Sequence, residues 1–449
     1  MQFELIISGG TIVFPGEGMA AADLAIESGK VAAILPRGHG ATASREIDAT
    51  GRFLFPGVVD CHVHVDLGPG EERWRESHSA ALGGVTTMLS YLLTSRPYDQ
   101  VFPQELAKAE ADSIVDFGFH FSLVTAEQVS CVDRFVRDYG VTSFKHFTNF
   151  RGNAGAYLGL KGTDDGHFWS ILEVLKRYPQ TVLAVHPENQ DILEALTPRL
   201  QARGRDDLAA YTESRPNFVE AIATQSALYM AYLSGSRVYV PHITSALSLQ
   251  VYEQERARND RIYAETCPHY LTHDMYSSVG TRGKVNPPLR TQGDIEALWN
   301  GIKQGVVEVV ASDHVPRRLD KKAGGIWKAS AGFPGTATLF PVMLSEGHHR
   351  RGLSLDRVAQ LVCRRPAEIF GLYPQKGTLR PGSDGDVAIV DLDLARTVKA
   401  GELGSFSDYS LYEGCVLKGW PVQTLVRGRT VMSEGRIADA EAHGCYLRR

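Results

Sequence analysis

Short apolar segments alternate with helical patterns through the middle of this 449-residue chain. Eight of these segments have the composition of β-strands, and they span residues 53–60, 84–89, 117–124, 141–147, 181–186, 237–242, 261–266 and 306–312. Strands of a parallel sheet that is buried on both faces are apolar along most of their length. Eight strand–helix units are what a (β/α)8 barrel requires, so the sequence predicts an α/β fold built on this barrel.

The two ends of the chain have a different pattern, in which apolar and polar residues alternate between glycine-rich turns. Such alternation is typical of strands with one buried face. We therefore expect residues 1–52 and 373–440 to form a small β-sandwich domain, residues 53–372 to form the barrel, and residues 441–449 to be a C-terminal tail.

The composition argues against several classes of partner. Lys and Arg number 47 against 52 Asp and Glu, so the net charge of −5 offers no basic field for nucleic acid or anionic lipid, and a small-molecule partner is expected. The six cysteines contain no CxxC pair, which disfavours a disulfide framework and a cysteine-based zinc site. No apolar run approaches the roughly 18 residues of a membrane span, and no secretory leader is recognisable, so we expect a cytoplasmic protein.

Polar side chains gather at the C-terminal ends of the predicted strands. His62 and His64 follow the first strand, His186 and His242 end the fifth and sixth, and Asp313 ends the eighth. In a (β/α)8 barrel this rim carries the catalytic groups, and a His-x-His pair in extended backbone has both rings on one face. A single histidine at a strand end is more often structural, but their coincidence at one rim predicts a site for zinc or a similar divalent metal.

Lys145 lies near the same rim, in the fourth predicted strand. A protonated ammonium group has no lone pair and repels a cation. A neutral amine that has reacted with carbon dioxide becomes a carbamate, an anionic group that can bridge two metals as a carboxylate does. The alternative is that Lys145 is an ordinary ion-pair partner for an acid such as Asp313.

The chain carries, in this order, the motifs PGVVDCHVH, FKHF, VHPEN, VPHITS, ETCPHYL, KVNPPLR and VVASDHVP. Together they resemble the cyclic amidohydrolases of the amidohydrolase superfamily, a group of dihydropyrimidinases, hydantoinases, allantoinases and class I dihydroorotases. The likeness covers nearly the whole chain, including the segment RRPAEIFGLYPQKGTL. It implies a binuclear metal-dependent hydrolase that opens a cyclic amide or imide, closest to hydantoinase or dihydropyrimidinase, and a dimer or tetramer.

The resemblance also implies the roles of the candidate site residues. The more buried of two divalent cations, expected to be zinc, would be bound by His62, His64, N6-carboxylated Lys145 and Asp313. The second cation would be bound by the Lys145 carbamate, His186 and His242, with a hydroxide bridging the pair. Asp313 would take the proton of that hydroxide and pass it to the departing amide nitrogen. His314 is a candidate for orienting Asp313, although a packing role is equally consistent with its position.

The chain departs from the dihydroorotases at the position where they grip the substrate carboxylate. They have an arginine two residues after the second histidine, and here that residue is Asp66. An acidic residue repels an anionic ring, so such a substrate is disfavoured unless another arginine acts as the clamp. The candidates for that clamp are Arg151, Arg290, Arg317 and Arg318. The segment KVNPPLR, by contrast, is more similar to dihydroorotases and allantoinases than to hydantoinases.

A second departure concerns the tyrosine that hydantoinases and dihydropyrimidinases have five residues after the bridging lysine. This chain has Phe150 there, and a phenyl ring cannot donate a hydrogen bond to a developing oxyanion. Either the metals carry that charge alone, or Tyr157, Thr148 or Asn149 is the donor.

The remaining substrate contacts implied by the resemblance are backbone groups at Asn286, Ala331 and Gly332. Other activities on the same site stay open, namely an allantoinase-like, a dihydroorotase-like or an acyclic amide hydrolase. A non-catalytic scaffold is a further alternative. Missing metal ligands would mark a scaffold, and the sequence lacks none of them.

Overall fold

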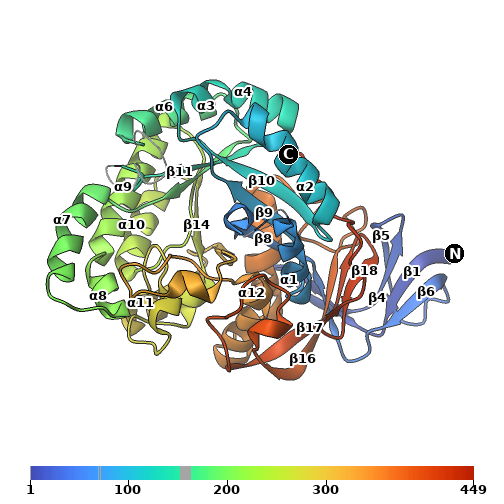
Figure 1. The fold of residues 1–449 in the computed structure, drawn as a ribbon. Coiled ribbons are helices and arrows are strands. Elements are labelled where there is room, and N and C mark those ends of the chain that lie inside the picture. The colour runs from blue at the N-terminus through green and yellow to red at the C-terminus, as the bar shows by residue number, and fades with distance from the viewer. Residues whose placement is uncertain (1, 69, 71, 152–162) are drawn as a thin grey trace. The chain divides into compact units, whose positions relative to one another are not determined.

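The structure is a computed structural model that describes residues 2–68, 70, 72–151 and 163–449. Its largest sheet has eight strands, which follow one another across the sheet in chain order (Figure 1). They are β8 (Val58–Val63), β9 (Val85–Leu92), β10 (Asp116–Ser122), β11 (Ser143–Phe147), β12 (Val182–His186), β13 (Val238–Val240), β14 (Ile262–Thr266) and β15 (Val309–Val310). The pairings from β10 to β15 are parallel. The predicted α/β class and barrel architecture are confirmed.

Burial explains why these segments form the central sheet. Every residue of β8, β9, β10, β11 and β12 is buried, as expected for strands covered on both faces. Their C-terminal ends therefore share one edge, where polar side chains from distant parts of the sequence can meet.

Helices follow the strands of this sheet along the chain: α1 to α11 lie between successive strands, and α12 comes after the last one (Figure 1). They are α1 (Glu76–Leu82), α2 (Tyr98–Asp112), α3 (Ala126–Ser130), α4 (Val132–Arg134), α6 (Asp165–Leu175), α7 (Gln190–Gln201), α8 (Leu208–Glu213), α9 (Asn217–Ser234), α10 (Ala246–Arg256), α11 (Gln292–Gln304) and α12 (Thr336–Val342). Several begin at a residue whose side chain accepts a hydrogen bond from a free backbone N–H of the first turn, as at Asp164, Asn189 and Asp207. No helix among the described residues is long and apolar enough to cross a membrane.

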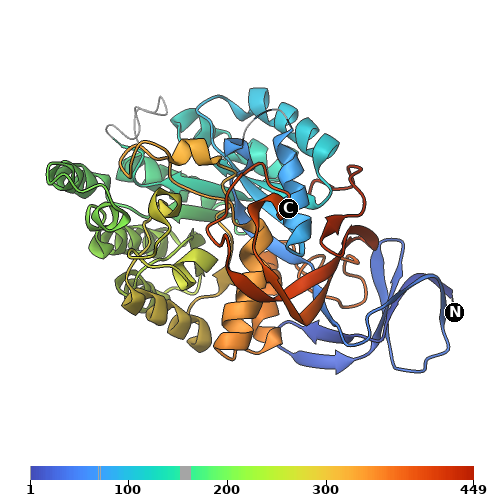
Figure 2. The same ribbon diagram turned by 60° about the horizontal axis from the view of Figure 1, so that its bottom comes forward.

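Two further sheets come from the ends of the chain (Figure 2). The four-stranded sheet has the order β5 (Lys30–Leu35), β4 (Asp23–Glu27), β1 (Gln2–Ser8) and β6 (Thr42–Asp48). The seven-stranded sheet has the order β19 (Arg436–Ile437), β18 (Arg429–Ser433), β17 (Val416–Val426), β16 (Val387–Thr397), β7 (Phe53–Pro56), β2 (Thr11–Phe14) and β3 (Gly18–Ala21). One apolar cluster joins the two sheets, with members such as Leu5, Leu24, Leu54, Val387 and Leu425. The expected β-sandwich of both termini is thus present.

The described residues divide into two compact units. The first comprises Met1–Leu89, Leu106–Gly118 and Pro334–Leu447, and the second comprises Ser90–Glu105, Phe119–Phe333 and Arg448–Arg449. The boundaries expected from the sequence, near residues 52, 372 and 440, stay predictions.

The first predicted strand, residues 53–60, is two strands in the structure. Phe53–Pro56 forms β7 and pairs with β16 in the seven-stranded sheet, whereas β8 begins at Val58 in the eight-stranded sheet. Gly57 separates them, and a Cβ at this residue would lie 1.9 Å from Oγ1 of Thr86. β8 also ends later than expected, at Val63 instead of residue 60, so His62 lies within β8 instead of after it.

Candidate metal centre

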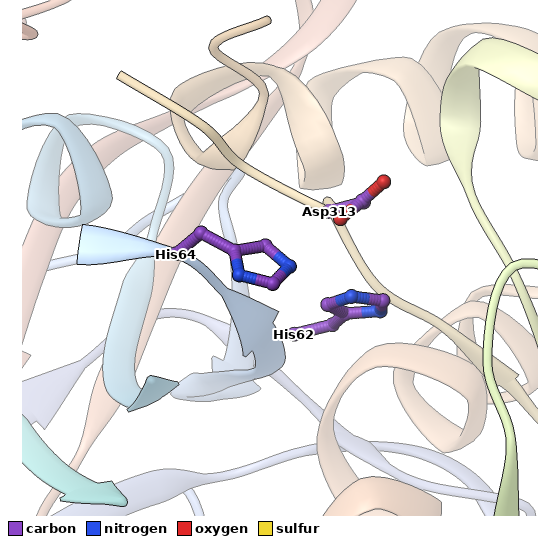
Figure 3. A group of neighbouring side chains, drawn as sticks. All are labelled: His62, His64 and Asp313. Atoms are coloured by element: carbon purple, nitrogen blue, oxygen red, sulfur yellow. The ribbon is translucent and has the colours of Figure 1, made fainter. Parts of the chain in front are cut away.

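Three of the predicted ligands, His62, His64 and Asp313, approach one another closely. One potential ligand atom from each lies within 4.8 Å of the others, and Figure 3 shows both imidazoles beside the carboxylate. His62 is in β8 and His64 comes directly after it. Because side chains alternate between the two faces of a strand, both rings lie on the same side. His62 and Asp313 are buried and His64 is partly buried. This arrangement can hold a divalent cation.

Lys145 lies in β11, and only 1% of it is exposed. Its Nζ is 4.7 Å from the centre of the Tyr91 ring and 5.2 Å from that of Phe147. Burial lowers the pKa of Lys145 to about 8, although the negative charges of Asp313 and Glu265 act in the opposite direction. The neutral amine, which is the form that reacts with carbon dioxide, is therefore far more populated near neutral pH than in an ordinary lysine.

The alternative role of Lys145 is that of an ion-pair partner, and this role requires a carboxylate close to its ammonium group. Among the residues that the structure describes, no carboxylate forms an ion pair with Lys145, and the influence of Asp313 on it is electrostatic. Burying an ammonium without a close counter-ion costs free energy of folding. The negative charge of a carbamate would be compensated by bound cations. The surroundings of Lys145 thus suit the modified side chain better than the unmodified one.

His186 and His242 form a second close pair. His186 ends β12 and His242 follows β13. Nδ1 of His186 lies 3.1 Å from Nε2 of His242. Two imidazole nitrogens that bind one tetrahedral zinc ion at about 2.0–2.1 Å are about 3.3 Å apart, so the pair fits a shared cation. Burial lowers the pKa of His186, which keeps its ring in the neutral form that binds metals. Lys145 is close enough to contribute to that lowering.

Two of these residues have an unusual backbone conformation. His242 has a φ of 42° and Asp313 a φ of 50°, in the left-handed region that side-chain-bearing residues seldom adopt. The N–H of His242 donates to Oε1 of Glu265 at 3.0 Å, and Tyr239 donates to the other oxygen of Glu265 at 2.6 Å. The buried carboxylate of Glu265 therefore stabilises the turn that presents His242. Backbone strain of this kind is concentrated at functional sites.

The structure adds a buried pair that the sequence analysis missed. Glu188 lies two residues after His186, and its Oε2 is 2.9 Å from Nε2 of that histidine. Its Oε1 accepts from Nη1 of Arg215 at 2.8 Å. Burial would raise the pKa of Glu188, but Arg215 and His186 together lower it to about 2. The spacing His-Pro-Glu after a strand end was visible in the sequence, but nothing local pointed to Arg215.

The candidate substrate-binding residues also have defined surroundings. Tyr211 donates a hydrogen bond to Oδ1 of Asn286. Gly332 donates its N–H to the carbonyl of Lys284 at 3.0 Å and has a φ of 90°, and Ala331 precedes it. A Cβ at Gly332 would lie 2.7 Å from Val315, so glycine is required there.

Phe150 stacks on Phe147 with a ring-centre distance of 4.2 Å and offers no donor. Of the alternative donors, Thr148 has its hydroxyl within 2.8 Å of the carbonyls of both His186 and Glu188, so its single proton already has an acceptor. Asn149 is buried, and Tyr157 lies outside the described residues. His314 is fully buried, and its N–H donates to Oγ of Ser312 at 3.1 Å.

Two of the candidate carboxylate clamps are already engaged. Arg290 pairs with the buried Glu220 at 2.9 Å and also donates to Thr244. Arg151 pairs with Asp165 at the start of α6. Neither guanidinium is therefore available to an anionic ring without losing a partner.

Comparisons with known proteins agree with this geometry. Residues 239–431 match the model of the amidohydrolase family. An L-hydantoinase from Paenarthrobacter aurescens is 34% identical over 100% of this chain and 98% of its own length. An allantoinase from Rubrobacter xylanophilus is 33% identical over 99% of this chain and 98% of its own length. The solved structure of the L-hydantoinase (dihydropyrimidinase) from Arthrobacter aurescens matches with a TM-score of 0.92 and 32% identity over 100% of both chains.

Proposed function

The chain belongs to the amidohydrolase family, and on this premise we propose that it opens the ring of a cyclic amide or imide with a pair of divalent cations. It is a hydrolase of the hydantoinase, dihydropyrimidinase and allantoinase group. Hydrolysis breaks the C–N bond of the ring, adds the oxygen of water to the carbonyl carbon and adds a proton to the nitrogen. The product is an open chain with a new carboxylate.

We propose that zinc is the metal, because imidazoles and oxygen ligands are its usual donors. His62, His64, carboxylated Lys145 and Asp313 would hold one ion, and the same carbamate, His186 and His242 would hold the other. When bound, such a pair lowers the pKa of water and stabilises negative charge on the reacting oxygens. The observation that carries the proposal is the cluster of His62, His64 and Asp313, together with a buried Lys145 that has no acidic ion-pair partner among the described residues.

The protein's own side chains would then move the proton and hold the ring. Asp313 takes a proton from the attacking water and gives it to the departing nitrogen, so one carboxylate acts as base and then as acid. His314 follows Asp313 in the chain and would keep its carboxylate oriented. Backbone groups at Asn286, Ala331 and Gly332 would hold the polar edge of the ring. Phe150, whose ring stacks on that of Phe147, would bound the pocket with an apolar surface.

The ring itself is best identified by a direct comparison of substrates. A hydantoinase or dihydropyrimidinase activity is the main proposal, and the similarity to an allantoinase over nearly the full length supports allantoin as the second candidate. We would measure kcat/KM for hydantoins, dihydrouracil, allantoin and dihydroorotate with the metal-loaded protein. A clear preference for dihydroorotate would contradict the proposal, because Asp66 occupies the place of the arginine clamp. Turnover of none of these rings would favour an acyclic amidase or a scaffold.

Lys145→Ala is expected to remove both the carbamate and most of the bound metal. The wild-type protein should have the mass of its sequence plus one carbon dioxide, and the variant should lack that increment. Metal analysis of the two proteins, purified in parallel, tests the second part. Lys176→Ala, at the end of α6 on the exposed surface, is the control and should retain both properties. Full metal occupancy in Lys145→Ala would refute the bridging role.

We further propose that the chain self-associates as a dimer or tetramer. The helix α9 exposes several large apolar side chains, namely Phe218, Ile222, Tyr229, Tyr232 and Leu233. Exposed patches of this kind are typical of surfaces that bind another protein, here a second copy of the chain. Analytical ultracentrifugation should give more than one chain per particle, and Tyr232→Glu should lower that number. A monomer at micromolar concentration would contradict this proposal.

We also propose that the protein works in the cytoplasm. All six cysteines are free, which suits a reducing compartment.

A further inference from the structure

We propose that Glu188, Arg215 and Tyr211 form a positioning network that orients both His186 and the side-chain amide of Asn286. The inference rests on the proposed function, because it takes His186 as a ligand of the second cation and Asn286 as a substrate contact. It goes further in assigning three residues that touch neither metal nor reacting atoms and in giving the side chain of Asn286 a role.

The first end of the network fixes which nitrogen of His186 is free. Glu188 is 1% exposed, and its carboxylate is paired with Arg215, so it can only accept the hydrogen bond from Nε2 of His186. The proton of a neutral imidazole is then on Nε2, and the lone pair is on Nδ1. Nδ1 is the atom that lies 3.1 Å from Nε2 of His242. Glu188 thus orients the lone pair toward the second cation.

The backbone around Glu188 is held as firmly as its carboxylate. The N–H of Glu188 donates to Oγ1 of Thr148 at 2.9 Å, and that hydroxyl lies 2.8 Å from the carbonyls of both His186 and Glu188. Thr148 directly follows β11, the strand of Lys145. The turn after β12 is therefore tied to the neighbouring strand end, so that the carboxylate has little freedom to follow a displaced imidazole.

Arg215 connects this end to the substrate side. One of its nitrogens binds Glu188, and its guanidinium carbon is 5.2 Å from the centre of the Tyr211 ring. Nζ of Lys284 is 4.7 Å from the same ring centre. Cations near an aromatic ring interact favourably with its π-electrons, so the two residues restrict where the Tyr211 ring can lie.

The second end of the network fixes the amide of Asn286. The Tyr211 hydroxyl donates to Oδ1 of Asn286, which assigns the oxygen and leaves Nδ2 as the free donor. Among the described residues, no acceptor takes a hydrogen bond from that Nδ2. Asn286 is partly exposed, so its amide can reach a bound ring. It is suited to donate to a ring carbonyl, which the phenyl group of Phe150 cannot do.

The first experiment measures metal binding, and it does not need a substrate. We expect Glu188→Gln to weaken binding of zinc at the second site about 10- to 100-fold, with the first site retained, in competition titrations monitored by metal analysis. NMR of isotope-labelled histidine should show that His186 loses its single tautomer. Glu255→Gln is the control, because Glu255 is also buried and paired with an arginine, Arg258, but its carboxylate holds neither a predicted ligand nor a segment beside one.

If Glu188→Gln fails to fold, Arg215→Lys tests the same contact, because it keeps the charge and loses the planar guanidinium. Unchanged second-site affinity together with an unchanged His186 tautomer, in either folded variant, would overturn the proposal.

The second experiment separates the two ends of the network. Tyr211→Phe removes the hydroxyl that orients Asn286 and should lower kcat/KM for the ring substrate about tenfold without changing metal content. Asn286→Ala should have a similar effect, and the double variant should be no worse than Asn286→Ala alone. Tyr252→Phe is the control, because the buried hydroxyl of Tyr252 binds Glu308 and Ile262 instead.

Additive losses in the double variant would overturn the Asn286 end of the network. If the wild-type protein opens none of the rings, the proposed function fails, and the metal and NMR measurements still decide the His186 end.

Discussion

Asp313→Asn is expected to keep the metals and to lower kcat by about 10²- to 10⁴-fold, the usual contribution of a general acid–base group. The amide has the shape of the carboxylate but cannot take up the proton of the attacking water. Asparagine also tolerates the left-handed backbone that Asp313 adopts, with its φ of 50°, so the variant should fold. Steady-state kinetics on the preferred ring, with metal analysis of the same sample, measure both quantities.

The control for Asp313→Asn is Asp320→Asn. Asp320 lies in the same segment after β15 and is exposed, and its ion pair with Lys321 is long, at 3.8 Å. This variant should have wild-type kinetics. If Asp313→Asn turns over at the wild-type rate with full metal, the proton must move through another group. If it loses the metals as well, Asp313 acts mainly as a ligand.

Lys376→Met is expected to cause a large loss of stability in the first unit. Lys376 is 1% exposed, and its ammonium contacts three buried carboxylates, those of Asp116, Asp384 and Asp386. Burial alone would lower the pKa of Lys376, but these acids raise it well above its ordinary value. Removing the cation leaves the acids without their shared partner, which typically costs about 3–5 kcal/mol. Denaturant unfolding monitored by circular dichroism measures the loss.

Lys30→Met is the matched control for this experiment. Lys30 also binds Asp384, at 2.9 Å, but its side chain is 54% exposed and Asp384 keeps its contact with Lys376. Exposed ion pairs contribute about 0–1 kcal/mol, so the midpoint of unfolding should change little. If both substitutions lowered the free energy of unfolding equally, the buried cluster would contribute no more to the stability of this unit than the exposed ion pair does.

The sequence contained enough information to predict the barrel and the candidate ligands, because both follow from local patterns. Strand-like apolar runs with a polar residue at one end indicate which side chains lie at the same rim. The prediction that the rings of His62 and His64 lie on one side follows from the alternation of side chains along a strand. The division at Gly57 was missed, since the run FLFPGVVD is apolar on both sides of the glycine. The clash that a Cβ would have with Thr86 depends on tertiary packing.

The network around Glu188 could not be predicted for a related reason. Arg215 lies 27 residues after Glu188, and Asn286 lies 75 residues after Tyr211, with helices between them. No periodicity of the sequence connects residues at such separations. From the sequence alone, both Arg215 and Tyr211 could have been ordinary surface residues. Only the fold shows that these side chains are neighbours. The same holds for Lys376, whose partner Asp116 is 260 residues away.

The left-handed backbone at His242 and Asp313 limits which amino acids can replace these two residues. Asparagine, aspartate and histidine are enriched in that conformation, whereas branched residues are strained there. In saturation libraries at these two positions, the folded members should therefore carry mostly glycine, asparagine, aspartate or histidine. New specificities should arise instead from those positions in the segments after the strands that neither bind a metal nor orient a ligand. Engineering for another ring would begin in those segments.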